Sequence, residues 1–180
     1  TVSDTNSYRY LRYLGPDGSY CNIAEMEFYG YGGTTPPPSG YAWEFDSGTQ
    51  GWTNDNNITN FGASGGYLNG TVSGGDPYMV SSDGLNVDIN NNKVIRIRLK
   101  NGTSESFATF YFATNAEGWF SEQKKIDFQI VPNDTNYTEY VVNLSSNPYF
   151  TGTLVRLRFD PNVNGATGNF SIDYIRICAS

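Results

Sequence analysis

The stretch Val94-Ile-Arg-Ile-Arg-Leu99 decides the fold class. Its residues alternate between aliphatic and charged, so the aliphatic side chains fall on one face of a strand and Arg96 and Arg98 on the other. This period of two is typical of a β-strand with one buried face. Since no stretch of useful length has a helical period, the sequence predicts an all-β fold.

Further strand signals follow the same logic along the chain. Asn-rich and Gly-rich turns separate the apolar runs, as at Asn90-Asn-Asn92 and Asn164-Gly165. An antiparallel β-sandwich of jelly-roll type is the simplest architecture that closes this pattern. The expected strands are 42–45, 94–99, 107–113, 126–130, 137–144, 154–159 and 170–178.

A proline-rich segment divides the chain into parts. Residues 34–40 hold three consecutive prolines between glycines and favour polyproline II, which predicts a short semi-rigid linker. Residues 1–33 are interpreted as a β-hairpin with its turn at Gly15-Pro-Asp-Gly18, and residues 41–180 as the β-sandwich domain. Because two strands alone bury too little to be stable in water, the hairpin must dock on the sandwich or on another molecule.

Composition excludes several classes of function. The chain has no histidine, which removes Ser-His and Cys-His nucleophiles and most zinc sites. Glycosidases that use two carboxylates do without histidine, but nothing in the sequence marks a facing pair. The net charge of -7 repels polyphosphates, and no apolar run reaches the roughly 18 residues of a membrane span. We therefore expect no enzyme activity, no nucleic-acid binding and no membrane span.

The cysteine and asparagine residues fit a secreted or cell-surface protein. Cys21 and Cys178 can pair in an oxidising compartment, within one chain or between chains, and the alternative is two buried thiols. Chance alone gives several Asn-x-Ser/Thr triplets in a chain of this composition, so glycosylation is a prediction only. The candidate glycosylation sites are Asn57, Asn69, Asn101, Asn133, Asn136, Asn143 and Asn169.

Several motifs resemble known families. Trp43-Glu-Phe-Asp46, Asp76-Pro-Tyr78, Leu157-Arg-Phe-Asp-Pro161 and the closing Ser171-Ile-Asp-Tyr-Ile-Arg-Ile177 make residues 41–180 similar to galactose-binding-like, jelly-roll carbohydrate-binding modules of bacterial glycoside hydrolases and surface proteins. The hairpin resembles the last two strands of discoidin-like (factor V/VIII type C) domains and covers only that tail. The first resemblance implies a non-catalytic module that binds glycans.

The resemblance also implies a structural calcium that joins the beginning and the end of the sandwich. The matching positions are Asp46 and Asp173, with Glu44 as a third. An aspartate inside an apolar strand needs a partner to offset its burial. The alternative is that Asp173 pairs with an arginine, such as Arg176 or Arg158, and that Asp46 caps a turn.

Aromatic side chains are the candidates for sugar binding, because pyranose C–H faces lie flat on exposed rings. Trp119, in a turn-like segment between two strands, is the first choice, followed by Trp52, Tyr78 and Tyr111. Most aromatic residues in such a chain belong to the core, and the Gly51-Trp52 pair also fits a structural role.

Four arginines on alternating strands form a second candidate group. They could bind an acidic polysaccharide, but a solvated outer sheet with cross-strand ion pairs is the interpretation we favour. These residues are Arg96, Arg98, Arg156 and Arg158.

Two functions from different classes compete. The leading one is a binding module that anchors a larger extracellular protein to a polysaccharide or glycan. The alternative is a self-assembling subunit of an extracellular glycoprotein fibre or surface matrix, in which residues 1–33 are donated to the sheet edge of a neighbouring subunit.

Overall fold

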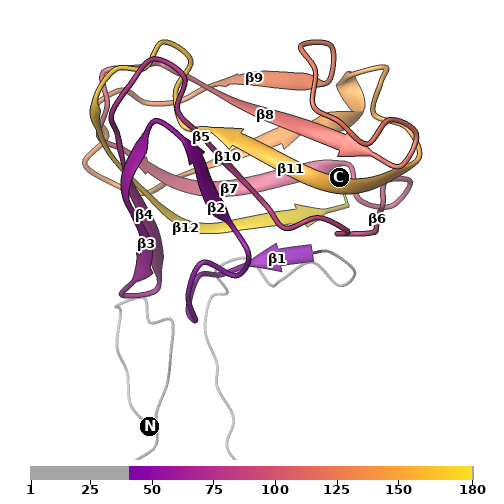
Figure 1. Ribbon diagram of the computed structural model, residues 1–180, viewed down its shortest axis with the longest axis horizontal. Coiled ribbons are helices and arrows are strands. Elements are labelled where there is room, and N and C mark those ends of the chain that lie inside the picture. Colours follow the sequence, from indigo (N-terminus) through magenta and orange to yellow (C-terminus); the bar gives the residue numbers. More distant parts are fainter. Residues whose placement is uncertain (1–40, 180) are drawn as a thin grey trace, which may run out of the picture. The chain divides into compact units, whose positions relative to one another are not determined.

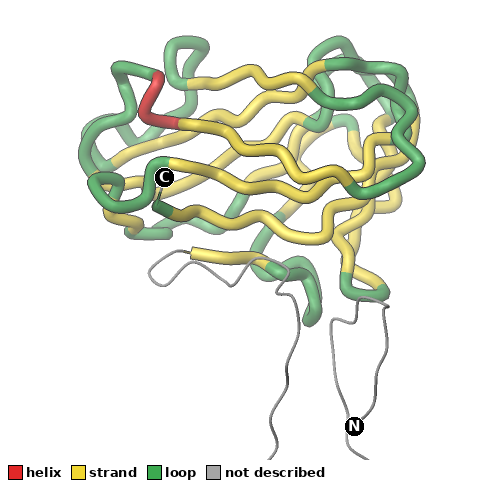
Figure 2. The backbone as a smooth tube through the Cα atoms, turned by 180° about the vertical axis from the view of Figure 1, so that it is seen from behind, coloured by secondary structure: helices red, strands yellow, loops and turns green. Residues whose placement is uncertain are grey.

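The computed structural model describes residues 41–179, and these form the predicted antiparallel β-sandwich. Two six-stranded sheets stack face to face, and one short 3-10 turn, η1 (Leu144–Ser146), interrupts the strands (Figures 1 and 2). The predicted hairpin and linker, residues 1–40, lie outside the described residues. Among the residues described, none form a helix long and apolar enough to cross a membrane.

The first sheet, sheet A, has the order β10-β7-β12-β4-β3, and β1 also pairs with β12. Its central strand, β12, pairs with β7 along most of its length and places Ile175 opposite Ile97. The strands are β1 (Tyr41–Trp43), β3 (Ile58–Ser64), β4 (Tyr67–Val72), β7 (Val94–Asn101), β10 (Thr138–Asn143) and β12 (Gly168–Cys178).

The second sheet, sheet B, has the order β2-β5-β11-β8-β9, and β6 also pairs with β11. The register places Arg158 of β11 opposite Tyr111 of β8. The strands are β2 (Thr53–Asn56), β5 (Tyr78–Val80), β6 (Val87–Asp88), β8 (Phe107–Thr114), β9 (Lys125–Gln129) and β11 (Thr153–Asp160).

The core lies between the sheets and is built from the alternating residues of the strands. Ile95, Ile97 and Leu99 are fully buried, as their period predicts. Phe110 and Phe159 of the facing sheet are also fully buried, with ring centroids 4.8 Å apart. Each such side chain contributes about 1.5–3 kcal/mol on burial, so this layer holds the two sheets together.

The sequence analysis missed the strands between residues 53 and 88. Strand β2 consists only of polar residues and lies at a sheet edge, and β4 includes Gly70, so neither has the apolar alternation of β7. The first strand also ends at Trp43 instead of Phe45. Phe45 has a φ of 56°, and its backbone N–H donates to the Gln50 side chain at 3.2 Å, which turns the chain out of the sheet.

Candidate functional site

A row of aromatic and cationic side chains crosses the outer face of sheet B. It consists of Tyr78 on β5, Arg158 on β11, Tyr111 on β8 and Lys125 on β9. The Arg158 guanidinium carbon lies 3.8 Å from the Tyr78 ring centroid and 4.6 Å from that of Tyr111, and the Lys125 ammonium lies 5.7 Å from the latter. These are cation–π distances, so the tyrosine–arginine row is held together across four strands.

Carboxylates fix the arginine of this row in place. Asp160 accepts two hydrogen bonds of 2.7 Å from the Arg158 guanidinium, and Asp76 accepts a third at 3.1 Å. Asp160 is only 7% exposed, and this burial raises its pKa to about 6, although Arg158 opposes the shift. Burial likewise raises the pKa of Tyr111 to about 12, and its hydroxyl donates to Glu122 at 2.9 Å. The row therefore presents a fixed set of polar groups.

The raised pKa of Asp160 predicts a pH dependence of stability. Folding favours the protonated carboxyl, so the stability that this group contributes is present below its unfolded pKa of 3.8 and is lost as the pH rises through about 6. Between pH 4 and pH 7 the free energy of unfolding should fall by about 2 kcal/mol relative to an Asp160→Asn variant. Urea unfolding across this range measures both slopes. Parallel pH profiles for the two proteins would contradict the assignment.

The loop between β8 and β9 carries the most exposed large hydrophobic side chain of the described residues, Trp119, at 76% exposure. Lys124, whose side chain is 4% exposed, anchors this loop from its buried side. Its ammonium donates to the backbone carbonyls of Glu117, at 3.0 Å, and of Trp119. The next residue, Phe120, lies 5.8 Å from the guanidinium of Arg156 on β11. The loop therefore holds an exposed indole beside the outer face of sheet B.

Lys124→Met should loosen this loop without unfolding the sandwich. Methionine fills the same space but cannot donate to the two carbonyls, so we expect amide hydrogen exchange in residues 115–119 to accelerate by about tenfold or more. Hydrogen exchange with mass spectrometry measures this rate. The matched control is Lys93→Met, at an exposed lysine on a different loop, which should leave residues 115–119 unchanged. Equal rates in both variants would show that Lys124 does not anchor the loop.

The four predicted sugar-binding residues differ in their exposure and contacts. Trp119 is exposed, and Tyr78 and Tyr111 lie in one row, as described. Tyr111 is only 8% exposed and contacts two cations, so it supports the row and offers little ring surface. The choice of Trp52 was wrong: it is 1% exposed and packs edge-on against Trp43 in the core, with ring centroids 5.3 Å apart.

Sequence reasoning did not single out Asp160 or Lys124 as functional. The motif Arg158-Phe-Asp160 contained a usable signal, because residues two apart on a strand share a face. Lys124 had none, since its carbonyl partners depend on the shape of the loop.

Each of the four candidate arginines is paired with a carboxylate. Arg158 pairs with Asp160 and Asp76, and the other pairs are Arg96–Glu139 at 2.8 Å, Arg98–Asp173 at 2.6 Å and Arg156–Asp83 at 3.1 Å. Their charges are therefore already neutralised. This arrangement favours the interpretation of an outer sheet with cross-strand ion pairs over binding of an acidic polysaccharide.

The predicted calcium ligands are not gathered into one site. Asp173, at a register shift in β12, pairs with an arginine, as in the alternative interpretation, and this arginine is Arg98. Glu44 accepts hydrogen bonds of 2.7 and 2.9 Å from Arg176, and Asp46 lies exposed after β1. Over residues 41–179 no three acidic or cysteine side chains cluster to hold a metal. The calcium site therefore stays a prediction.

The predicted modifications have mixed outcomes. Cys178 is a buried free thiol, and Cys21 lies outside the described residues, so their pairing stays a prediction. Asn101 was a wrong choice for glycosylation, because it is 1% exposed and its amide donates to the carbonyls of Glu105 and Val131 at 2.9 and 3.0 Å. Asn69 is half-buried. The exposed candidates are Asn57, Asn133, Asn136, Asn143 and Asn169.

Comparison with known proteins identifies the class of fold. No protein-family model and no curated protein matches the chain. The solved structure of CBM1 of BiXyn10A is 16% identical, covers 78% of this chain and 97% of its own, and superposes with a TM-score of 0.54. A mutant of the family 29 carbohydrate-binding module CBM29-2 is 15% identical over 77% of this chain and 85% of its own, with a TM-score of 0.52.

A third neighbour is CBM86 from Roseburia intestinalis, described as a low-affinity xylan-binding module. It is 7% identical over 78% of this chain and 96% of its own, with a TM-score of 0.51. At these identities the likeness concerns the fold. The described residues thus have the β-sandwich fold of carbohydrate-binding modules, as the sequence predicted.

Proposed function

We propose that this chain is a non-catalytic module that binds a polysaccharide or glycan through Trp119 and the outer face of sheet B. The observation that carries the proposal is the indole of Trp119, 76% exposed on a loop anchored by a buried lysine. An exposed ring on a loop with an anchored backbone is a group on which a pyranose can stack. The tyrosine–arginine row, on the outer face of the same sheet, supplies hydrogen-bonding groups for the sugar hydroxyls.

The glycan is expected to be neutral. The cations of this face already have carboxylate partners: Arg156, Arg158 and Lys125 pair with Asp83, Asp160 and Glu122. A uronate would have to displace one of these carboxylates, whereas a hydroxyl can add to the existing pairs. Because a xylan-binding module shares this fold, xylan is the first polysaccharide to test.

We propose that the module anchors an extracellular protein on its glycan. Assembly into a fibre through residues 1–33 depends on a segment outside the described residues, and it stays a prediction that deletion of residues 1–33 would test.

Affinity electrophoresis tests the proposal. The full chain is run through native gels that contain soluble xylan, mixed-linkage β-glucan, glucomannan or polygalacturonate, with a non-binding protein as the mobility reference. We expect retardation in at least one neutral polysaccharide and none in polygalacturonate. Unchanged mobility in every gel would refute glycan binding, and retardation by polygalacturonate alone would refute the neutral ligand.

A further inference from the structure

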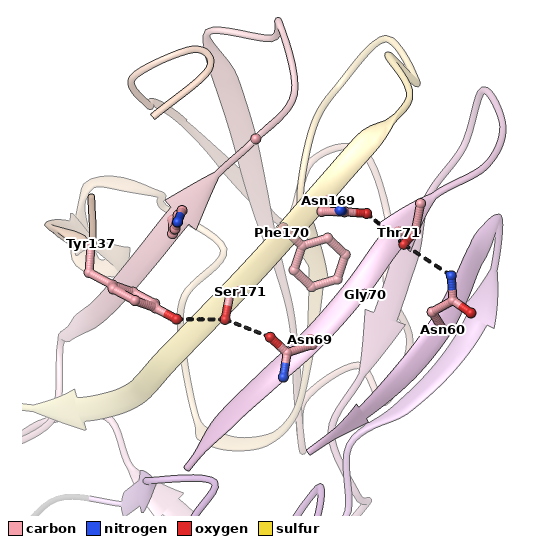
Figure 3. Close-up of a pocket in the computed structure, with 10 residues that line it drawn as sticks. Asn60, Asn69, Gly70, Thr71, Tyr137, Asn169, Phe170 and Ser171 are labelled. Carbon is pink, nitrogen blue, oxygen red and sulfur yellow. Dashed lines mark hydrogen bonds between the residues drawn. The ribbon is translucent and has the colours of Figure 1, made fainter. Parts of the chain in front are cut away.

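The outer face of sheet A has a depression of its own, on the side of the sandwich opposite the tyrosine–arginine row. Figure 3 shows it above strands β3, β4 and β12. Its volume is ≈ 670 Å³, and its walls are amide, hydroxyl and phenol side chains together with one lysine, Lys100. No carboxylate lines it, although acidic residues outnumber basic ones in the chain by 18 to 11. With one lysine and no carboxylate, this is a polar surface of slight positive charge on an acidic protein.

The polar side chains form two rows across neighbouring strands. In the first row, Asn60 donates to Thr71 at 3.4 Å and Thr71 donates to Asn169 at 2.8 Å. The register places Asn169 of β12 directly opposite Thr71 of β4. The row therefore crosses three strands, and its members fix one another's orientation (Figure 3).

The second row lies two residues further along the same strands, about 7 Å from the first. Ser171 donates to Asn69 at 2.7 Å, and the Tyr137 hydroxyl lies 2.8 Å from Ser171. Between the rows, Gly70 and Phe170 are buried, so no side chain rises between the two lines of polar groups. The result is a groove bordered by oriented hydrogen-bonding groups.

Several polar atoms of the groove have no partner within residues 41–179. The Asn169 side-chain amide and the Lys100 ammonium are unused donors, and the Asn60 side-chain carbonyl is an unused acceptor. Lys100 forms no ion pair in the described part of the chain, whereas every arginine there does. The groove thus has hydrogen-bond donors and an acceptor that neighbouring residues help to orient and that remain available to a ligand.

We infer that this groove is a second saccharide site, which takes a neutral glycan whose hydroxyls bridge the two rows. A hydroxyl both donates and accepts, which matches the mixed set of unused atoms. A metal ion would need carboxylates, and a polyanion would need more than one unpaired cation. The site is on the other sheet from the proposed binding face, so the two can be tested separately in one protein.

The test is a titration of the ¹⁵N-labelled full chain, followed by NMR. The protein is produced in a host without N-glycosylation, because a glycan on Asn169 would itself fill the groove. Xylohexaose, cellohexaose and mannohexaose are the probes. With at least one of them, the backbone amides of Thr71, Asn169 and Ser171 should shift and saturate.

Two variants sharpen the test. Lys100→Ala should weaken the binding reported by these amides about fivefold or more, and Asn169→Asp should do the same because it keeps the Thr71 contact but loses the donor. The matched control is Lys93→Ala, a second lysine with no ion pair in residues 41–179, which should change nothing.

The outcomes separate this inference from the proposed function. If only amides on the outer face of sheet B shift, the second site is overturned and the proposed function stands. If only amides of sheet A shift, the proposed function is overturned and the second site stands. Equal binding by the Lys100→Ala and Lys93→Ala proteins would overturn the second site, and no shift with any hexaose would overturn both.

Discussion

Replacing Trp119 with alanine is expected to weaken polysaccharide binding at least tenfold, a loss of about 1.4 kcal/mol, since aromatic anchors carry a large share of the binding energy of small interfaces. The side chain is 76% exposed, so the substitution should leave the free energy of unfolding within about 0.5 kcal/mol of the wild type. Isothermal titration with the polysaccharide that retards the protein most strongly measures the affinity.

The control for this substitution is Tyr41→Ala. Tyr41 is also an exposed aromatic residue, at 37%, but it belongs to β1 of the other sheet. Binding by this variant should match the wild type. If both variants lose affinity equally, or if neither does, Trp119 is not the ring on which the sugar stacks.

The substitution Arg158→Ala is expected to have the largest effect on stability. It leaves the carboxyl of Asp160, which is 7% exposed, without the guanidinium that donates two hydrogen bonds to it. Breaking such a pair from one side costs about 3 kcal/mol, which should appear as a lower midpoint in guanidinium chloride at pH 7. Part of the loss should be recovered near pH 5, where Asp160 can take up a proton.

Arg96→Ala provides the matched comparison. The Arg96–Glu139 pair has a similar length, 2.8 Å, but its side chains are 35% and 28% exposed. Solvent screens such a pair, so its loss should cost about 1 kcal/mol or less. Similar losses for the two variants would mean that burial does not distinguish these ion pairs.

The fold could be predicted where burial leaves a period in the sequence. Strand β7 and its neighbour β12 lie in the middle of sheet A, and their inward residues are apolar at every second position, apart from the register shift at Asp173 in β12. Strand β2 lies at an edge and is polar throughout, so backbone pairing with β5 holds it in place and its side chains leave no pattern. Sequence reasoning also missed the interior strands β4 and β5, because β4 includes Gly70 and β5 has only three residues.

The sequence could predict single residues of the candidate site but not their arrangement. Trp119 could be found because a tryptophan in a polar turn has little to pack against. Trp52 was misjudged because the Gly-Trp pair says nothing about which way the ring points, and the structure packs it against Trp43. The contact between Arg158 and Tyr78 joins β11 and β5, which are distant in the sequence, and it depends on a strand order that the residues do not encode locally.

The most direct test of the central claim uses the chain's own fluorescence. Of its three tryptophans, Trp43 and Trp52 are 2% and 1% exposed, so acrylamide should quench chiefly Trp119. The measurement is acrylamide quenching with and without a saturating concentration of the polysaccharide that retards the protein in gels. If a sugar ring covers the indole, the quenchable fraction of the emission should disappear. A quenchable fraction that stays unchanged at saturation would contradict glycan binding through Trp119.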